Sequence, residues 1–422
     1  MIDGATTTSE CDLPIADSWL PGLSQVRAYR DPLGFLTRTA EAYPDIAHMR
    51  LGKRRDVLVF HPEHVRDVLL ASERQMRRGF NPILRRIMGN GLLSSQGEFH
   101  RSQRRLIQPV LSRRRLEIFS ETMVRNTLLT SDEWKPGTTL DIAEAMMQLS
   151  FEIIVDIIFG TRPDDAQNLR EVVNQAIGMT GRKGYMRKFL ADKLNLFASG
   201  GPESYICRLD EIVYASIDKQ RNGNEKVNSL IFMLLDVLCS DESNTAENIR
   251  QVRNEAVTLL FAGHETIANA LAWTWYMLSQ NPTEENRLHE ELEQVLDQRT
   301  PSFEDMPRLT YTTAILREAM RLYPPVWLIV RRPIQDWQLG RYRIPAGSYL
   351  YVSPYLVHRD RRFFDNPDEF TPSRWVSGTC DSSRHRFSYI PFGVAGWKCI
   401  GDSFAMTEGV IILATIAQKW RM

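Results

Sequence analysis

One segment limits the possible folds more than any other: Ala246–Gln280 carries helical periodicity without a break. At about 1.5 Å per residue such a helix is roughly 50 Å long, and Asn281-Pro282 ends it. The stretch FAGHETIANALAWTWYML within it is apolar on nearly every side, which indicates burial along its length. We therefore expect a large molecule built around one long central helix. The centre of this helix holds Gly263, Glu265 and Thr266, which destabilise a buried helix. We therefore expect them to serve a function.

Most of the remaining chain is also helical in pattern, and two short regions alternate as strands do. Residues 45–62 predict a hairpin around Gly52-Lys53, and residues 337–352 predict a weaker strand set with a turn at Pro345-Ala346-Gly347. The predicted fold class is mainly α with a small β region. Further helices are predicted at residues 63–72, 99–111, 140–159, 203–221, 229–239, 283–297 and 310–322.

Composition indicates a globular protein, since 43% of the 422 residues are hydrophobic and 25% are charged. No linker, repeat or low-complexity tract divides the chain, so we expect a single domain over residues 1–422, with a lead segment to about residue 30. Lys+Arg and Asp+Glu both number 52, which gives no argument for nucleic acid as a partner. The chain lacks an apolar run near the roughly 20 residues that span a bilayer and a leader pattern at its start. We expect a cytoplasmic protein without a membrane anchor.

One cysteine differs from the others in its context. Cys399 stands between a loop with Gly393 and Gly396 and an apolar helical pattern that follows Gly401. The start of a helix stabilises a thiolate, and the glycines allow the backbone to approach a flat ligand closely. The alternative is a packed core thiol. Neither a disulfide framework nor a zinc site is indicated, because no CxxC pair occurs among Cys11, Cys207, Cys239, Cys380 and Cys399.

Phe392-Gly393, Cys399 seven positions after Phe392, and then Gly401 together resemble the haem-binding loop of cytochromes P450. The resemblance implies that the Cys399 thiolate is the metal ligand of one haem b per chain and favours O–O cleavage. It also implies that Phe392, Gly393 and Gly401 shape the haem site. The sequence departs from the family at Trp397, normally Arg or His, and at Ala395, normally Gly. The C-terminal part, residues 400–422, is short for the family.

Two further segments are similar to the family's structural network behind the haem. Glu318-Ala319-Met320-Arg321 resembles its ExxR pair, whose members share one helix face at i and i+3. Residues 370–375, FTPSRW, are similar to the later PxRF-type segment, which makes Arg374 the third member of the network. An isolated ExxR would be a surface helix pair.

The centre of the long helix, Ala262 to Thr266, resembles the family's oxygen-activation motif. By this resemblance Gly263 removes side-chain bulk where dioxygen must sit, and Thr266 with Glu265 relays protons to it. The alternative for a threonine inside a helix is a packing residue whose hydroxyl bonds the preceding turn.

Haem also carries two propionate carboxylates, which bind cations and other hydrogen-bond donors. Residues 97–105, GEFHRSQRR, resemble the helix that supplies them in the family, and this implies His100 and Arg104 as contacts. Arg331 stands where the family often places a third cation, with Arg332 as the alternative.

The implied reaction is insertion of one oxygen atom of O₂, the cosubstrate, into a C–H bond or C=C bond of an apolar small molecule. The chain has no flavin or nucleotide motif, so electrons from NAD(P)H must arrive through separate proteins, a ferredoxin and its reductase as in soluble bacterial members. A basic docking face or plain solvated surface is formed by Arg101, Arg105, Arg113, Arg114, Arg115 and Lys398.

Residues 321–332, RLYPPVWLIVRR, resemble bacterial members that oxidise terpenoids, so we expect a terpenoid of secondary metabolism, with fatty acids and polyketides as competitors. Val326, Leu328 and Ile329 offer an apolar wall. We expect a monomer. Two alternatives are a peroxide-driven or rearranging haem-thiolate enzyme and a haem-binding sensor without turnover.

Overall fold

The computed structural model describes residues 13–16, 27–28, 30–51, 54–79, 81–160, 166–180, 202–223, 228–239, 245–376 and 385–422. Contacts divide the chain into two compact units. Unit 1 comprises Met1–Gly79, Met320–Glu369 and Asp381–Cys399, and unit 2 comprises Phe80–Ala319, Phe370–Cys380 and Ile400–Met422. The single domain over residues 1–422 stays a prediction.

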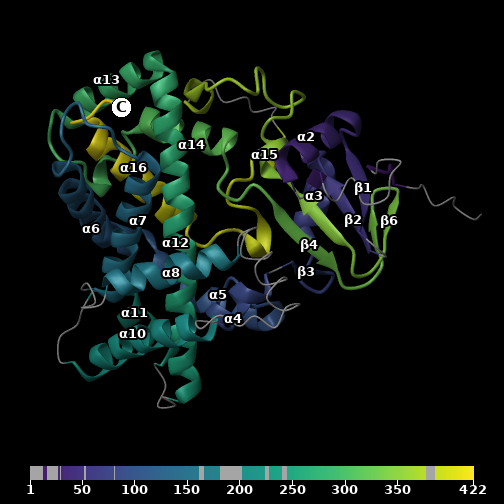
Figure 1. Cartoon of the computed structure of the whole chain (residues 1–422), viewed down its shortest axis with the longest axis horizontal. Coiled ribbons are helices and arrows are strands. Elements are labelled where there is room, and N and C mark those ends of the chain that lie inside the picture. Colours follow the sequence, from purple (N-terminus) through teal and green to yellow (C-terminus); the bar gives the residue numbers. More distant parts are fainter. Residues whose placement is uncertain are drawn as a thin grey trace, which may run out of the picture. The chain divides into compact units, whose positions relative to one another are not determined.

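Unit 1 holds the larger sheet, with strand order β1-β2-β7-β4-β3, and a separate two-stranded sheet of β5 and β6. Short helices flank the larger sheet (Figure 1). The elements are α2 (Pro32–Ala42), β1 (Ile46–Leu51), β2 (Arg54–Val59), α3 (Pro62–Leu70), β3 (Met76–Arg78), β4 (Ile329–Pro333), β5 (Trp337–Leu339), β6 (Tyr342–Ile344), β7 (Tyr349–Val352), α15 (Pro354–Val357), η4 (Arg386–Ser388) and η5 (Ala395–Trp397).

The predicted hairpin is β1 and β2, which pair antiparallel with Ile46 opposite Val59. Successive side chains of a strand point to opposite faces. Accordingly Val57 and Val59 enter one hydrophobic cluster of unit 1, whereas Leu58 enters the other. All three are fully buried or nearly so, because β2 lies inside the sheet and both of its faces are covered.

The second predicted strand region has its predicted turn at Pro345 to Gly347, where the Ser348 N–H donates to the Pro345 carbonyl at 3.2 Å, and it has a further turn that was not predicted. β5 and β6 form a hairpin whose turn includes Gly340, with φ of 55°. The predicted turn leads into β7, which pairs parallel with β2 and antiparallel with β4. A local pattern cannot reveal this pairing, because β2 and β7 are far apart in the chain.

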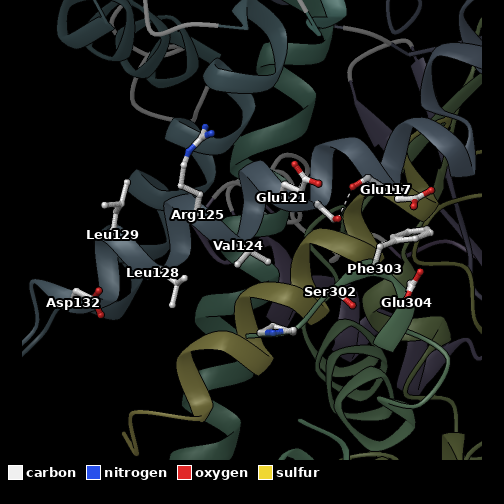
Figure 2. A pocket seen from close by; sticks show the side chains of 12 residues that line it. Glu117, Glu121, Val124, Arg125, Leu128, Leu129, Asp132, Ser302, Phe303 and Glu304 are labelled. Carbon is white, nitrogen blue, oxygen red and sulfur yellow. Dashed lines mark hydrogen bonds between the residues drawn. The ribbon is translucent and has the colours of Figure 1, made fainter. Parts of the chain in front are cut away.

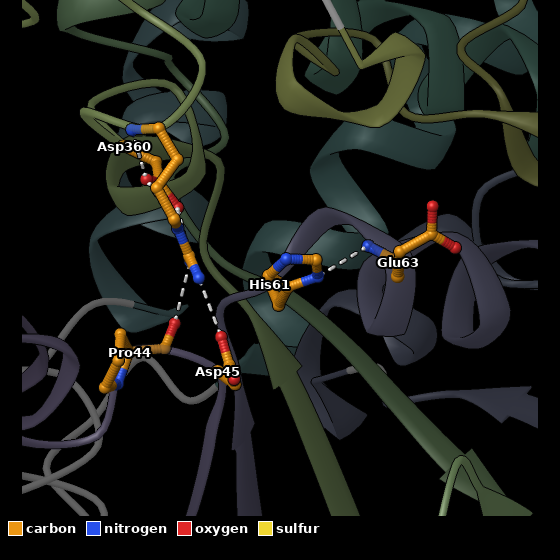
Figure 3. A network of polar contacts seen from close by, with 6 residues as sticks. Pro44, Asp45, His61, Glu63 and Asp360 are labelled. Atoms are coloured by element: carbon orange, nitrogen blue, oxygen red, sulfur yellow. Dashed lines mark hydrogen bonds and ion pairs between the residues drawn. The ribbon is translucent and has the colours of Figure 1, made fainter.

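Arg362 ties the segment after α15 to the start of β1, and its partners Pro44, Asp45 and Asp360 are labelled in Figure 3. Its guanidinium donates to the Asp45 carboxylate at 2.7 Å and to the Pro44 carbonyl at 3.1 Å, and it also binds Asp360 at 2.6 Å. Arg362 therefore bridges two segments of unit 1, and although burial raises the pKa of Asp45, the contacts with Arg362 lower it overall.

Unit 2 is helical. Its elements are α4 (Pro82–Met88), α5 (Gly97–Ile107), η1 (Gln108–Leu111), α6 (Arg113–Asp132), α7 (Ile142–Phe159), α8 (Ala166–Thr180), α10 (Pro202–Asn222), α11 (Leu230–Leu238), α12 (Ala246–Gln280), α13 (Pro282–Leu296), η2 (Phe303–Asp305), most of α14 (Thr310–Leu322), η3 (Pro372–Trp375) and α16 (Asp402–Ala417). The predicted class, mainly α with a small β region, is confirmed.

The long helix is α12, and it has the predicted bounds. The Thr245 hydroxyl caps its start by accepting from the Asn248 N–H at 3.3 Å, and Asn281 ends it before α13 begins at Pro282. Most of its residues between Val252 and Leu278 are buried. In Figure 1 it is the long green helix running through the helical part.

The prediction missed some helices and shifted the end of another. α6 was not predicted, because polar Ser120, Asn126 and Thr127 interrupt the apolar pattern on its buried face. α5 ends at Ile107 and continues as a 3₁₀ turn, since Pro109 cannot donate the next helical hydrogen bond. Among the described helices, none is both long and apolar enough to cross a membrane.

Candidate functional site

The Cys399 loop is a tight turn that leaves its cysteine accessible. Gly393, with φ of 65°, turns the chain, and the Cys399 N–H donates back to the Phe392 carbonyl at 2.8 Å. The Cys399 side chain is exposed. Gly401 then caps α16 without a side-chain hydrogen bond. The predicted loop-then-helix arrangement around the cysteine is present, with Phe392 and Gly393 closing the loop.

The backbone conformation of Ala395 is one that glycine adopts most easily, which agrees with the glycine that the family usually has at this position. Its φ is 57°, in the left-handed region, where a side chain costs roughly 1–2 kcal/mol. The loop keeps its glycine-type conformation although the residue is alanine, and the chain bears that strain.

Trp397 and Arg331 form a buried contact beside the cysteine loop. The Arg331 guanidinium on β4 lies 4.5 Å from the centre of the Trp397 ring, and Arg78 on β3 lies 5.6 Å from the same ring. Arg331 is only 7% exposed and Trp397 only 9%. Within the described part of the chain, the Arg331 Nε and the Trp397 Nε1 are buried donors without a hydrogen-bond partner. Burial, together with Arg78, lowers the pKa of Arg331 to about 9, so it stays charged at neutral pH.

These orphaned donors fit a ligand that carries carboxylates. A buried cation without a counter-ion is strongly unfavourable, and an added carboxylate would accept from both Arg331 and Trp397. Haem has two such groups. Unit 1 therefore offers an accessible thiol at Cys399 and buried donors at Arg331 and Trp397. These groups fit haem.

Glu318 organises a polar network within unit 2. It is fully buried and accepts from the Thr371 N–H at 3.0 Å, the Arg374 Nε at 2.9 Å and the Trp375 Nε1 at 2.8 Å. One carboxylate thereby fixes the whole of η3 to α14. Trp375 was not singled out from the sequence, although it directly follows Arg374.

Arg321 organises the corresponding segment of unit 1. Its guanidinium is fully buried and donates to the carbonyls of His358 at 2.9 Å, Pro367 at 2.6 Å and Glu369 at 2.9 Å. The Phe364 ring lies 5.1 Å from it. Arg321 thus satisfies three backbone carbonyls of the irregular segment that follows α15.

The oxygen-activation motif lies on α12. The Thr266 hydroxyl donates to the Ala262 carbonyl at 2.9 Å, so its oxygen keeps free lone pairs that can accept a further hydrogen bond. Burial raises the pKa of Glu265 above the usual value of a glutamate side chain. His264 is fully buried, and its Nδ1 lies 2.9 Å from the Leu260 carbonyl.

Gly263 has a packing role in this structure. A Cβ at this position would lie 3.0 Å from two atoms of Ile154 on α7, which is closer than ordinary contact. The glycine therefore lets α12 approach α7. Its predicted role in clearing space for dioxygen stays a prediction.

His100 and Arg104 lie one turn apart on α5 in unit 2. His100 is fully buried, whereas Arg104 is partly exposed. They share unit 2 with Gly263, Glu265 and Thr266, while Cys399, Arg331 and Gly393 belong to unit 1.

A groove of about 580 Å³ lies on α6 and the segment Pro301 to Glu304 (Figure 2). Val124, Leu128 and Phe303 line it together with Glu117 and Glu121. None of the predicted site residues contributes to this groove, so it is not the site that the motifs indicate.

Residues 18–422 match the family model described as Cytochrome P450. The chain belongs to the cytochrome P450 family. It is 34% identical over 93% of its length to cyclooctatin synthase of Streptomyces melanosporofaciens, covering 86% of that protein. It is 32% identical over 99% of its length to cyclooctat-9-en-7-ol 5-monooxygenase of the same organism, covering 93% of it. Pentalenene oxygenase of Streptomyces avermitilis is 31% identical over 93% of this P450, which covers 87% of that protein.

The fold agrees with this family. The crystal structure of the cytochrome P450DA heme domain matches 97% of this chain with a TM-score of 0.84, at 23% identity and over 91% of its own length. This P450 is therefore an oxidoreductase that uses a haem iron and O₂. As a family member it receives electrons through redox partners.

Proposed function

We propose that this P450 hydroxylates a terpenoid in secondary metabolism. The observation that carries the proposal is the set of relatives, which are named for cyclooctatin, cyclooctat-9-en-7-ol and pentalenene. All three span most of this chain. A terpenoid would need an apolar pocket with few polar contacts.

Each predicted residue has a role in this proposal. Haem, when bound, supplies redox-active iron that activates dioxygen. The Cys399 thiolate holds the iron, and Phe392, Gly393 and Gly401 keep its loop closed and close to the flat ring. His100, Arg104 and Arg331 bind the propionates. Glu318, Arg321 and Arg374 hold the backbone segments of the two units in place.

Proton delivery is the task of Glu265 and Thr266. Burial raises the pKa of Glu265, which favours a carboxyl that holds a proton before it releases it. The Thr266 hydroxyl, which donates to Ala262, can accept a hydrogen bond from a water and pass a proton on. Both residues are half-buried on the otherwise mostly buried α12.

Apolar side chains of unit 1 supply part of the substrate wall in this proposal. Val326 is 46% exposed, and Leu328 and Ile329 are half-buried. An exposed valine in a run of apolar residues suits contact with a hydrocarbon.

We further propose a ferredoxin and ferredoxin reductase as the redox partners of a monomeric, cytoplasmic enzyme. Arg101 and Arg105 on α5 and Arg113 and Arg114 on α6 are exposed. Glu98 approaches Arg101 only to 3.8 Å. Such a basic surface attracts an acidic partner and makes electron transfer depend on salt. Arg105→Glu should slow reduction by a bacterial ferredoxin, most strongly at low salt, while the exposed Arg77→Glu in unit 1 should not.

The substrate proposal is tested by titrating the purified holoenzyme with cyclooctat-9-en-7-ol, pentalenene, a long-chain fatty acid and a macrolide polyketide. The absorbance of the haem reports displacement of water by a bound substrate. Turnover with a ferredoxin and reductase pair then identifies a hydroxylated product. We expect binding and product only with the terpenoids. A product from the fatty acid or the polyketide alone would reject the terpenoid assignment.

A further inference from the structure

Helix α6 of unit 2 carries apolar side chains on two opposite sides. On one side Phe119 is buried, and its ring centroid lies 6.3 Å from that of Phe404 on α16. Val124 and Leu128 lie on the other side, because a helix has about 3.6 residues per turn. They are only half-buried, and Leu129 beside them is 59% exposed. This second side is therefore an apolar surface that remains accessible.

The accessible side of α6 is the floor of the groove that this helix forms with residues 301–304 (Figure 2). The half-buried Phe303 lines the groove from that second segment. The volume of the groove, about 580 Å³, lies within the range of about 300–1,000 Å³ that is usual for small-molecule sites. Exposed apolar patches often mark such sites. The groove therefore has room for a small molecule with a hydrocarbon part.

Three exposed carboxylates gather at one end of the groove. Glu117 and Glu121 stand one turn apart on α6, and Glu304 lies at the same end, next to Phe303 (Figure 2). Among the residues that the structure describes, none of the three carboxylates has an ion-pair partner. The Arg113 guanidinium lies 5.7 Å from the centre of the Phe303 ring, but it forms no ion pair with these carboxylates. This end of the groove is therefore negative.

The other charged residues that line the groove are already paired. The Lys419 ammonium donates to the Asp132 carboxylate at 2.6 Å, and the Arg125 guanidinium donates to the Asp156 carboxylate at 3.2 Å. These pairs balance the charge of the part of the groove that lies towards the end of α6. The groove is consequently negative near Glu117 and apolar along the following turns of the helix.

We propose that this groove is a second small-molecule site, and that it binds an amphiphilic organic cation. The positively charged head group lies among Glu117, Glu121 and Glu304, and the hydrocarbon chain covers Val124 and Leu128. Attraction between opposite charges places the head group, and removal of apolar surface from water holds the chain. A neutral hydrocarbon substrate would leave the carboxylates unused. The inference therefore goes beyond the proposed function and does not rest on the identity of the substrate.

The test titrates the purified holoenzyme with decyltrimethylammonium by calorimetry, below the concentration at which this ion forms micelles. Its nitrogen has no lone pair and cannot bind the haem iron, so the haem absorbance should stay unchanged. We expect a single ion to bind per chain, and more weakly at high salt. Tetramethylammonium should bind at least about a hundredfold more weakly, because it lacks the hydrocarbon chain. Decyl sulfate, which has the chain but the opposite charge, should not bind to the groove.

Two double variants separate the groove from the rest of the surface. Glu117→Gln/Glu121→Gln should weaken binding of decyltrimethylammonium about fivefold, since exposed ion pairs each contribute little. Glu290→Gln/Glu293→Gln is the matched control, because it removes two exposed carboxylates from α13 and changes the net charge equally. Its affinity should equal that of the wild type.

Four outcomes would overturn the proposal. The wild type binds no decyltrimethylammonium, or it binds decyl sulfate equally well without a change in haem absorbance. The haem absorbance changes in step with the heat of decyltrimethylammonium binding, which would place the ion in the haem pocket. The two double variants have the same affinity, which would mean that the groove carboxylates do not hold the head group.

Discussion

Glu318→Ala removes the acceptor of three donors at once. The carboxylate is fully buried and accepts from the Thr371 N–H, the Arg374 Nε and the Trp375 Nε1 at 3.0, 2.9 and 2.8 Å. The Arg374 side chain is only 10% exposed. Stranding a buried charge costs about 3–5 kcal/mol, and each neutral donor left unsatisfied adds about 1–3 kcal/mol. With one stranded charge and two unsatisfied neutral donors, the loss is at least about 5 kcal/mol, which is comparable to the total stability of many proteins, about 5–15 kcal/mol.

We expect Glu318→Ala to prevent holoprotein from accumulating. Glu318→Gln keeps one acceptor oxygen and should retain part of the network, with a smaller loss of about 2–3 kcal/mol. Glu290→Ala on α13 is the control, because it removes an exposed carboxylate and should change stability by less than about 0.5 kcal/mol.

The assay measures haem content after purification and the urea midpoint of unfolding by circular dichroism. The expected order of midpoints is wild type and Glu290→Ala highest, Glu318→Gln lower, and Glu318→Ala lowest. A haem-replete Glu318→Ala protein with the midpoint of the Glu290→Ala control would show that this carboxylate does not hold the structure together.

Three further changes test separate parts of the account. Thr266→Ala should keep its haem but divert electrons from product to hydrogen peroxide, because the proton relay is broken; an unchanged ratio of product to NADPH consumed would contradict this role. Ala395→Gly should raise the unfolding free energy by about 1 kcal/mol, since φ of 57° then costs nothing; a lower urea midpoint would show that the loop has no such strain. Burial raises the pKa of Glu255 from 4.5 to about 7, so the folded state binds more protons between these pH values and stability falls as pH rises through that window, by on the order of 3 kcal/mol. Glu255→Gln should remove this slope in urea titrations at about pH 5 and pH 8, and a slope equal to that of the wild type would refute it.

Local spacing was sufficient to predict the elements that carry the motifs. α12 has the predicted bounds because its apolar pattern and the Asn281-Pro282 stop are both local signals. Cys399 stands in a tight loop ahead of α16, and Arg374 of the later PxRF-type segment reaches Glu318. Each of these motifs is a short stretch of neighbouring residues, so a single sequence is enough to predict it.

Features that depend on distant parts of the chain escaped prediction. Arg78 is paired with Arg331 across β3 and β4, and no sequence pattern near Arg78 predicts that partner. The parallel pairing of β2 with β7 is non-local for the same reason. Gly263 was interpreted through its motif alone, whereas its contact with Ile154 depends on how α7 packs.

The absorption spectrum of the reduced carbon monoxide complex tests the central claim most directly, because it reports the ligand of the haem iron. Cys399 is accessible in its loop, and a cysteine thiolate shifts the main band far to the red of that of a histidine-ligated haem. We expect this shifted band in the wild type and its loss in Cys399→Ser. A wild-type band at the histidine-ligated position, or a shifted band that persists in Cys399→Ser, would contradict thiolate ligation by Cys399.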